Sequence, residues 1–558
     1  MSFQNDMIID NGTGSAVRAD LTDAFKSLAN NSSGSSAPST NYVSQFFANT
    51  STGIMQINNT SGNAFINLFT LAGGPAFAVD GTINSVNIGK GANSVANNTV
   101  LGESALDASV SGEGNTAIGK NSLTALTSGA NNTAIGRQAL AANTTASNNT
   151  ALGAYTLDSN TTGTENTAVG YLALEANVSS GGNTAVGFAA LDANSSGNNN
   201  TGIGRGALGA NTTGDSNTAV GKNALDANTT ASNNTAVGLD ALGANTTGAN
   251  LVAVGKDALT TNTTGNSSVA VGLEALKLNT TGSNNVGIGQ EALQQNTSAS
   301  NNTGVGHNAL KANTTGTNNT SVGAYALDAN TTGDSNTALG QGSLTVATTA
   351  DNNTAVGHAA LHLTTTGASN SAVGKDALKN NTTASNNVGV GNNALFANTT
   401  GGNNVALGTF VLDANTTASD NVGVGHNALT TNTTGTRNVA IGSACLDANT
   451  TANNNTGVGY AALGANTTGA NNTSIGTYSL DANSTGIENT ALGAYALTDN
   501  TTASNNTAVG YYALAVNTTG AYNVAVGHAA LDANTTASYN TSVGYNSLSA
   551  NTEGATNT

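Results

Sequence analysis

The histidines are the side chains best suited to proton transfer or metal binding, and their spacing keeps them apart. Four of the five each directly follow a glycine of a 17-residue repeat, three, four and six repeats from one another: His307, His358, His426 and His528. A metal site needs three or four ligands around one centre. One chain cannot bring these rings together. We therefore expect exposed histidines, no catalytic site, no bound metal or cofactor, and no enzymatic activity.

Cysteine and aspartate also have structural interpretations. The single cysteine, Cys445, stands three residues after a repeat glycine, where most repeats carry Ala or Ser, and is expected to be a buried free thiol. Aspartate recurs in the string Leu-Asp-Ala-Asn and is expected to lie on a solvated face, at Asp192, Asp226, Asp328 and Asp532.

Tyrosine is concentrated toward the end of the chain, where eight of the 12 tyrosines follow residue 459 and no Lys or Arg follows Arg437. Spacings of 17 residues predict that some of these rings stack on consecutive repeats. Tyrosine offers flat, amphipathic contact area. One interpretation is therefore a surface that contacts the sugar rings of a glycan, and the other is a ladder of rings that only stabilises the fold. The candidate receptor-contact residues are Tyr478, Tyr495, Tyr511, Tyr512, Tyr522, Tyr539 and Tyr545.

The repeat that carries these residues is regular. Its glycine occurs 27 times from Gly102 to Gly544 in steps of 17, each time with leucine four residues later. Positions are counted below from this glycine, so leucine is at +4. Position −1 is always Val, Ile or Leu, −2 is almost always small, −4 and +7 are mostly Asn, and +1 and +2 vary. A period of 17 is too short for helical repeats and predicts an all-β, parallel β-solenoid of 27 coils.

Two short strands are expected in each coil. Around Gly221, Thr218 and Val220 share one face of the first strand and Ala219 takes the other, while Leu225 and Ala227 form the apolar pair of the second. The small residues at −2 have two interpretations. Either they meet two further copies of the chain in a homotrimer, which we favour, or they lie inside a thin single-chain coil.

Composition narrows the functional classes. The 558 residues carry a net charge of −17, only 8% are charged, and Trp is absent. An acidic chain lacks the basic footprint that nucleic-acid binding needs. No apolar run is long enough to cross a membrane as a helix, and the first residues do not resemble a secretory signal.

The strings at 84–89, 268–272 and 438–442, such as Asn-Val-Ala-Ile-Gly, resemble the head repeat of YadA-type trimeric autotransporter adhesins. The resemblance covers about residues 83–548. It implies a left-handed parallel β-roll in which the motif forms the inner strand and three chains build one head.

The first 80 residues contain an apolar stripe on a predicted short helix (Val17, Leu21, Phe25 and Leu28), a linker with Pro38, and apolar runs at 45–47, 53–57 and 64–69. This order resembles the N-terminal region of tail-fibre proteins of tailed phages, especially those of marine cyanobacteria. The resemblance implies attachment to a tail or baseplate protein of the virion.

The domain prediction is therefore a virion-attachment region at 1–80, a transition at 81–101, repeats at 102–548 and an uncapped tail at 549–558. The primary hypothesis is a homotrimeric tail fibre, assembled in the host cytoplasm, that contacts a host glycan or carries a distal tip protein. The alternatives are a bacterial trimeric surface adhesin and a monomeric ice-binding or scaffold solenoid. Adjacent threonines on opposite faces of a strand count against ice binding.

Overall fold

The computed structural model describes strands within residues 33–83, Ser51, and the continuous segment 85–558. The chain divides into two compact units, residues 1–185 and 186–558. The expected helix at Val17–Leu28 and the linker around Pro38 lie outside the described residues.

The first unit begins with a four-stranded sheet in the order β1-β2-β3-β4. Its strands are β1 (Ser33–Gly34), β2 (Phe46–Asn49), β3 (Ile54–Asn58) and β4 (Phe65–Thr70). β1 and β2 are parallel, whereas β2 with β3 and β3 with β4 are antiparallel. The last three strands overlap the three apolar runs of the N-terminal sequence.

An antiparallel segment leads into the repeats. It consists of β5 (Gly81–Ile83), β6 (Val86–Gly89), a short 3-10 helix η1 (Ala92–Ser94) and β7 (Thr99–Gly102). β5 pairs with β6 and β6 with β7 in antiparallel fashion, and β7 pairs with β8 in parallel. The change of direction at β7 therefore marks the first coil of the solenoid.

Each later repeat contributes one three-residue strand. These strands are β8 (Thr116–Ile118), β9 (Thr133–Ile135), β10 (Thr150–Leu152), β11 (Thr167–Val169), β12 (Thr184–Val186), β13 (Thr201–Ile203), β14 (Thr218–Val220), β15 (Thr235–Val237), β16 (Val252–Val254), β17 (Val269–Val271), β18 (Val286–Ile288), β19 (Thr303–Val305), β20 (Thr320–Val322), β21 (Thr337–Leu339), β22 (Thr354–Val356), β23 (Ser371–Val373), β24 (Val388–Val390), β25 (Val405–Leu407), β26 (Val422–Val424), β27 (Val439–Ile441), β28 (Thr456–Val458), β29 (Thr473–Ile475), β30 (Thr490–Leu492), β31 (Thr507–Val509), β32 (Val524–Val526) and β33 (Thr541–Val543).

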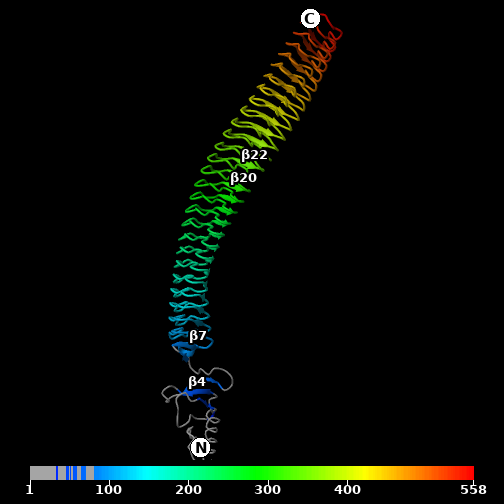
Figure 1. Ribbon diagram of the computed structural model, residues 1–558. Helices are drawn as coiled ribbons and strands as arrows, with labels where there is room; N and C mark the ends of the chain where they lie inside the picture. Colours follow the sequence, from blue (N-terminus) through cyan, green and yellow to red (C-terminus); the bar gives the residue numbers. More distant parts are fainter. Residues whose placement is uncertain are drawn as a thin grey trace, which may run out of the picture. The chain divides into compact units, whose positions relative to one another are not determined.

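The strands stack in parallel with the register of the sequence repeat. β14 pairs with β15 through Thr218 with Thr235 and Val220 with Val237, residues 17 apart. Figure 1 shows the strands of residues 186–558, from cyan to red, following one another along the stack. At ~4.8 Å per coil, β13 to β33 span roughly 100 Å. The predicted parallel β-solenoid with a 17-residue period is confirmed.

The prediction of a second strand in each coil is wrong. Asn223 at +2 and Leu225 at +4 both have left-handed backbone conformations, with φ of 55° and 53°. Alternation between left-handed and ordinary residues cannot form an extended strand. The segment still bonds to its neighbours, because the Leu225 N–H donates to the carbonyl of Ala241 at 3.0 Å. It also turns Ala224 and Leu225 inward together, in place of the predicted pair Leu225 and Ala227.

The repeat glycine is required by both conformation and space. Gly221 has φ of 141°, and a Cβ built on it would lie 2.3 Å from the carbonyl oxygen of Gly238 in the next coil. Real Cβ atoms do not approach a carbonyl oxygen so closely. Any side chain at this position would push neighbouring coils apart, which explains why the glycine is unbroken along the repeat.

The small residues at −2 lie inside the single chain. Ala219, Ala224 and Leu225 have no exposed surface and form an apolar half of the coil interior. The interpretation that the −2 face meets other chains is therefore wrong, and the thin single-chain coil is correct. The outward-facing residues of the strand are those at −3 and −1, such as Thr218 and Val220.

The other half of the interior is polar and consists of two rows of asparagine. At +7, Asn228 Nδ2 donates to Asn211 Oδ1 in the preceding coil at 2.8 Å and to the Ala231 carbonyl of its own coil at 3.0 Å. At −4, Asn217 Oδ1 accepts from the backbone N–H of Asn234 at 3.0 Å. A buried amide costs free energy unless it is hydrogen-bonded. The stacking supplies partners for amides that no isolated coil could satisfy.

The +7 row is interrupted in two consecutive coils, where Ala347 and Thr364 replace asparagine. Both residues are fully buried. Asn330 Oδ1, which would accept from the next amide of the row, is buried without a hydrogen-bond partner. Asn381 Nδ2 donates to the Ala384 carbonyl of its own coil at 3.0 Å, but in the preceding coil it meets the Thr364 hydroxyl, at 3.3 Å, in place of an amide oxygen. The polar half of the interior is therefore weakest in these coils.

Candidate functional site

The outer face of the strands is one regular surface of the solenoid. The side chains at −1 form a row of Val, Ile and Leu, and many remain well exposed, such as Ile203 (39%), Ile441 (41%) and Ile475 (43%). Thr, Val or Ser at −3 forms a second row beside it. Continuous exposed apolar surface on a soluble protein usually marks a contact site. This apolar strand face was missed in the sequence because the favoured interpretation turned the small residues at −2 outward, toward other chains.

The distal tyrosines form an aromatic corner at positions +1 and +2 of the coils from Gly459 to Gly544. Tyr478 stacks on Tyr495 with ring centroids 5.6 Å apart, and Tyr495 stacks on Tyr512 at 5.0 Å. Tyr511 meets Tyr512 edge to face at 4.3 Å, and Tyr545 stacks on His528 at 5.0 Å. The predicted stacking on consecutive coils is confirmed for Tyr478, Tyr495 and Tyr512.

A second aromatic pair lies at position +12, away from this corner in the repeat. Tyr522 and Tyr539 are stacked with centroids 5.1 Å apart and ring planes within 1° of each other, as the spacing predicted. Both are exposed. The seven candidate residues therefore form two groups, five at the distal corner and two at +12. Their role in receptor contact stays a prediction.

Hydrogen bonds between tyrosines raise the pKa of two hydroxyl groups in the distal corner. A side-chain hydrogen bond with Tyr460 raises the pKa of Tyr478, and a side-chain hydrogen bond with Tyr512 raises the pKa of Tyr511. These hydroxyls therefore stay protonated at neutral pH and act as neutral donors and acceptors. The corner presents hydroxyl groups and ring edges without charge.

The four repeat histidines lie several coils apart, and three of them contact an aromatic ring of a neighbouring coil. His307 packs edge-on against Tyr325 at 5.1 Å, His426 against Phe410 at 6.4 Å, and His528 against Tyr545. Within the described part of the chain, no three His, Cys, Asp or Glu side chains come together in a group that could hold a metal ion.

The aspartates at +5 are less solvated than expected. Asp328 and Asp532 each bury one carboxylate oxygen that lacks a hydrogen-bond partner, and Asp413 does the same. Burial raises the pKa of Asp226 and Asp328 above the ordinary aspartate value. The carboxylate folds against the turn instead of extending into water, which a sequence pattern cannot indicate.

Charged pairs occupy the same corner in the central coils. The ammonium group of Lys277 lies 2.8 Å from Glu274 Oε1, and that of Lys379 lies 3.0 Å from Asp376 Oδ1. The hydrogen bond from Lys277 lowers the pKa of Glu274, and that from Lys311 lowers the pKa of Glu291. Acids at +2 and lysines at +5 thus neutralise each other along this stretch.

Cys445 is a free, buried thiol, as predicted. Burial raises the pKa of Cys445 to about 12. The thiol is therefore protonated at neutral pH, and this residue offers no nucleophile.

A comparison with protein-family models finds no match, and comparisons with curated proteins and solved structures likewise find none. Among the described residues, no helix is both long and apolar enough to cross a membrane.

The sequence interpretation missed one further feature, a hollow of about 370 Å³ in the central coils. It is lined by Tyr325, Gln341, Gly342, Thr345, His358, Ala359, His362 and Lys379. Its signal in the sequence is the pair Gly342 and Ala359, which are small residues at +2 in consecutive coils. The solenoid therefore offers three surfaces for binding: the apolar strand face, the distal tyrosine corner and this hollow.

Proposed function

We propose that the chain is the shaft of a homotrimeric fibre, a phage tail fibre that attaches to the virion through residues 1–80 and extends a rod toward the host surface. The observation that carries this proposal is the apolar strand face. Its row of Val, Ile and Leu at −1 runs along the stack in one direction and is not covered by the chain itself.

Packing of copies through this face would remove the exposed row from water. The hydrophobic effect favours such burial, at roughly 25 cal/mol for each Å² of apolar surface. The contact must extend along the rods, because every coil contributes one residue to the row. Three rods packed side by side around a common axis would bury all three rows, which agrees with the resemblance to trimeric adhesin heads.

Rigidity is the second property that suits a shaft. Each coil is short and makes many of its hydrogen bonds to the coils on either side, so the stack behaves as a one-dimensional array of similar interfaces. Among the described residues, the side chains at +1 and +2 vary without disturbing the backbone. Such a rod separates two ends by a fixed distance and displays different side chains along its length.

The mass in solution tests the oligomer. The chain has a mass of 54.4 kDa, so a homotrimer has three times that mass by light scattering after size exclusion. Replacing Val390, Leu407 and Val424 with lysine is expected to weaken the trimer. The matched control replaces Thr400, Thr417 and Thr434, exposed residues of the same coils. A wild-type monomer, or equal loss in both variants, would overturn the proposed contact face.

Receptor contact by the distal tyrosines is a separate part of this proposal. Replacing Tyr478, Tyr495 and Tyr512 with alanine should reduce adsorption of virions to host cells without shortening the fibre. Unchanged adsorption would reject these residues as the contact. A bacterial trimeric adhesin would form the same trimer. Antibodies against the chain would label virions if it is a tail fibre and bacterial surfaces if it is an adhesin.

One observation favours ice binding as a second candidate. Thr201, Thr218 and Thr235 lie in register on the outer strand face, spaced by one coil. The threonine pairs at +8 and +9 do not form such a surface, because the Thr229 hydroxyl donates to the Thr246 carbonyl at 3.2 Å. Inhibition of ice recrystallisation by the purified chain would support this candidate over the fibre.

A further inference from the structure

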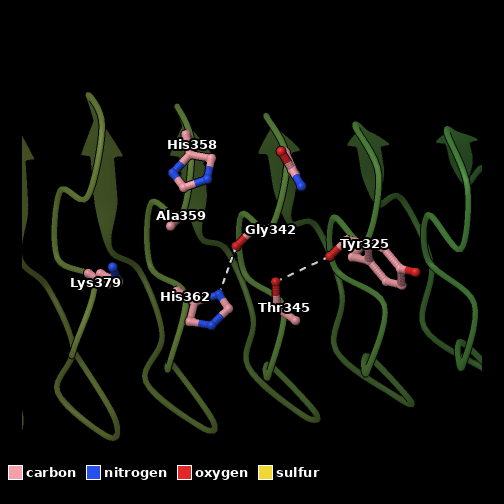
Figure 2. Close-up of a pocket in the computed structure, with 8 residues that line it drawn as sticks. Tyr325, Gly342, Thr345, His358, Ala359, His362 and Lys379 are labelled. Atoms are coloured by element: carbon pink, nitrogen blue, oxygen red, sulfur yellow. Dashed lines mark hydrogen bonds between the residues drawn. The ribbon is translucent and has the colours of Figure 1, made fainter.

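We propose that the hollow beside Tyr325 is a binding site for one or two pyranose sugar rings. The proposal deepens the adhesion proposed above and rests on it for its biological purpose. The geometry of the hollow, shown in Figure 2, stands by itself: His358 and His362 lie on one side, Tyr325 on the other, and Gly342 between them.

The hollow exists because two consecutive coils lack a side chain of any length at +2. Gly342 has φ of 65°, and a Cβ built on it would meet nothing nearer than the Thr345 hydroxyl at 3.6 Å. Ala359 follows at the same position of the next coil. Most other coils carry a larger side chain at this position, such as Glu274 or Tyr495, and a few carry Ala or Gly. The space is therefore built by residue choice within an unchanged backbone.

Tyr325 provides an aromatic surface at one end of this space. Its side chain is 42% exposed, and its aromatic partner is His307 in the preceding coil, which meets it at 76°. In the following coil the equivalent residue is Gly342, so no side chain at +2 stacks on the ring from that direction. An aromatic ring with an open face is the group on which the C–H face of a sugar packs.

Polar groups that both donate and accept hydrogen bonds surround this ring. The Nδ1 of His362 lies 3.0 Å from the Gly342 carbonyl, which can only accept, so this nitrogen carries the proton. In the neutral ring, Nε2 is then an acceptor. The Gln341 amide offers both a donor and an acceptor, and His358 lies exposed at the rim. Sugar hydroxyls likewise donate and accept, so the lining matches them.

The charges exclude an anionic ligand. The cation that lines the hollow is Lys379, and its ammonium group is bonded to Asp376 Oδ1 at 3.0 Å. The chain as a whole carries a net charge of −17. A phosphate or sulfate would therefore find no unpaired cation here. The volume of about 370 Å³ lies near the lower end of the range of roughly 300–1,000 Å³ for small-ligand sites, which suits one or two sugar rings.

Saturation-transfer NMR on the full chain with glucose, galactose and N-acetylglucosamine tests the site. We expect binding of at least one sugar with a Kd on the order of 1 mM. Tyr325→Ala should weaken it by roughly tenfold or more, and Gly342→Tyr should abolish it by stacking a second ring in the hollow. Phe410→Ala is the matched control, since Phe410 also lies at +2 but has Asn393 and Asn427 beside it.

Loss in both Tyr325→Ala and Gly342→Tyr, with full binding by Phe410→Ala, supports the site. Three results overturn it: no signal from the wild type, equal binding by all variants, or equal loss in the control. None of these sugar-binding results depends on the oligomer mass that light scattering measures. Failure of the sugar site and failure of the trimeric fibre are therefore read from different measurements.

Discussion

Tyr325 and Tyr495 occupy the same position of the repeat and have similar left-handed backbone angles, with φ of 57° and 60°. Their surroundings differ. Tyr495 lies between Tyr478 and Tyr512, which stack on it from the two neighbouring coils. Tyr325 has His307 on one side and Gly342 on the other. One ring is part of a column, and the other closes one end of a hollow.

The comparison shows that the neighbouring coil, 17 residues away, decides what a side chain of this solenoid can do. The backbone offers the same position in each coil, so the type of residue alone does not define a site. A stacked tyrosine presents its edge and hydroxyl, whereas a tyrosine beside glycine also presents a face. The surface that a side chain exposes therefore depends on how adjacent coils differ at the same position.

The interior beneath the two corners differs as well. Under the distal corner, Asn500 Nδ2 donates to Asn483 Oδ1 at 2.9 Å and its own Oδ1 accepts from Asn517 at 3.0 Å. Under the hollow, Ala347 interrupts the same row and leaves Asn330 Oδ1 unpartnered. The coils that line the hollow are also those with the incomplete polar interior.

The largest expected effect tests whether the two regions share one scaffold. Gly340→Ala, beside the hollow, and Gly493→Ala, in the distal corner, both place a Cβ 2.5 Å from the carbonyl oxygen of the next repeat glycine. We expect each to destabilise the local coils by about 3 kcal/mol or more, from left-handed strain together with overpacking. Amide hydrogen exchange in the flanking strands measures this loss.

Gly342→Asn serves as the control for these substitutions, because asparagine is common at +2 and the position has open space. It should leave hydrogen exchange nearly unchanged. A much smaller loss at one repeat glycine than at the other would show that the two regions do not share the same backbone constraint.

An intermediate effect is expected from the asparagine row. Ala347→Asn should supply the missing donor to Asn330 Oδ1 and stabilise the coils under the hollow by about 1–2 kcal/mol, the usual cost of an unsatisfied buried acceptor. Asn500→Ala should destabilise the distal coils by about 1–3 kcal/mol, because Asn483 Oδ1 loses its donor and Asn517 Nδ2 loses one of its two acceptors. Local hydrogen exchange again provides the measurement.

Ala347→Asn completes the asparagine row under the hollow, and Asn500→Ala interrupts the row under the distal corner. Should Ala347→Asn destabilise its coils, the interruption would be a packing requirement of the hollow instead of a missing hydrogen bond. Thr364→Asn, at the same position of the next coil, separates these explanations.

The smallest effect is a difference in pH dependence. Burial raises the pKa of Asp481, which lies in the distal coils, and of Asp447, which lies just before them. The folded state therefore binds protons before the unfolded state does, and stability should rise as the pH falls from 7 toward about 4. The pKa of Glu274 and Glu291 is lowered by their lysine partners, so the stability that these two carboxylates contribute should be lost only below about pH 4.5.

Each carboxyl should contribute less than ~1 kcal/mol after solvent screening. Thermal unfolding at pH 7 and pH 4.5 tests the distal part, with Asp481→Asn as the variant that should reduce the pH dependence. A wild-type protein that becomes less stable over this interval would contradict the sign.

Much of the scaffold could be predicted from the sequence. The 17-residue period, the strand that ends before Gly221, the rows of asparagine and the stacking of Tyr495 follow from repetition alone. Which face of the strand lies inside the coil could not be predicted, because Thr218, Ala219 and Val220 alternate equally well with either face inward. The left-handed conformation of Leu225 also has no sequence rule, so the second strand was predicted wrongly.

The candidate site was predicted only where side chains are present. Tyrosines at intervals of 17 residues indicate a column, whereas the hollow depends on what Gly342 and Ala359 lack. Missing side chains become visible only when adjacent coils are compared position by position. The partial burial of Asp328 likewise depends on how its turn folds back, which the repeat pattern does not encode.

The interrupted asparagine row has a mechanical consequence. Hydrogen bonds between coils run along the stack, so a pull on the two ends loads all the bonds at one interface together and passes the same tension to every interface in turn. The interface with the fewest bonds then sets the force that the rod withstands. At the coils of Asn330 and Ala347, one bond of the row is missing. Among the coils of residues 186–558, the stack under tension should part there first, beside the hollow.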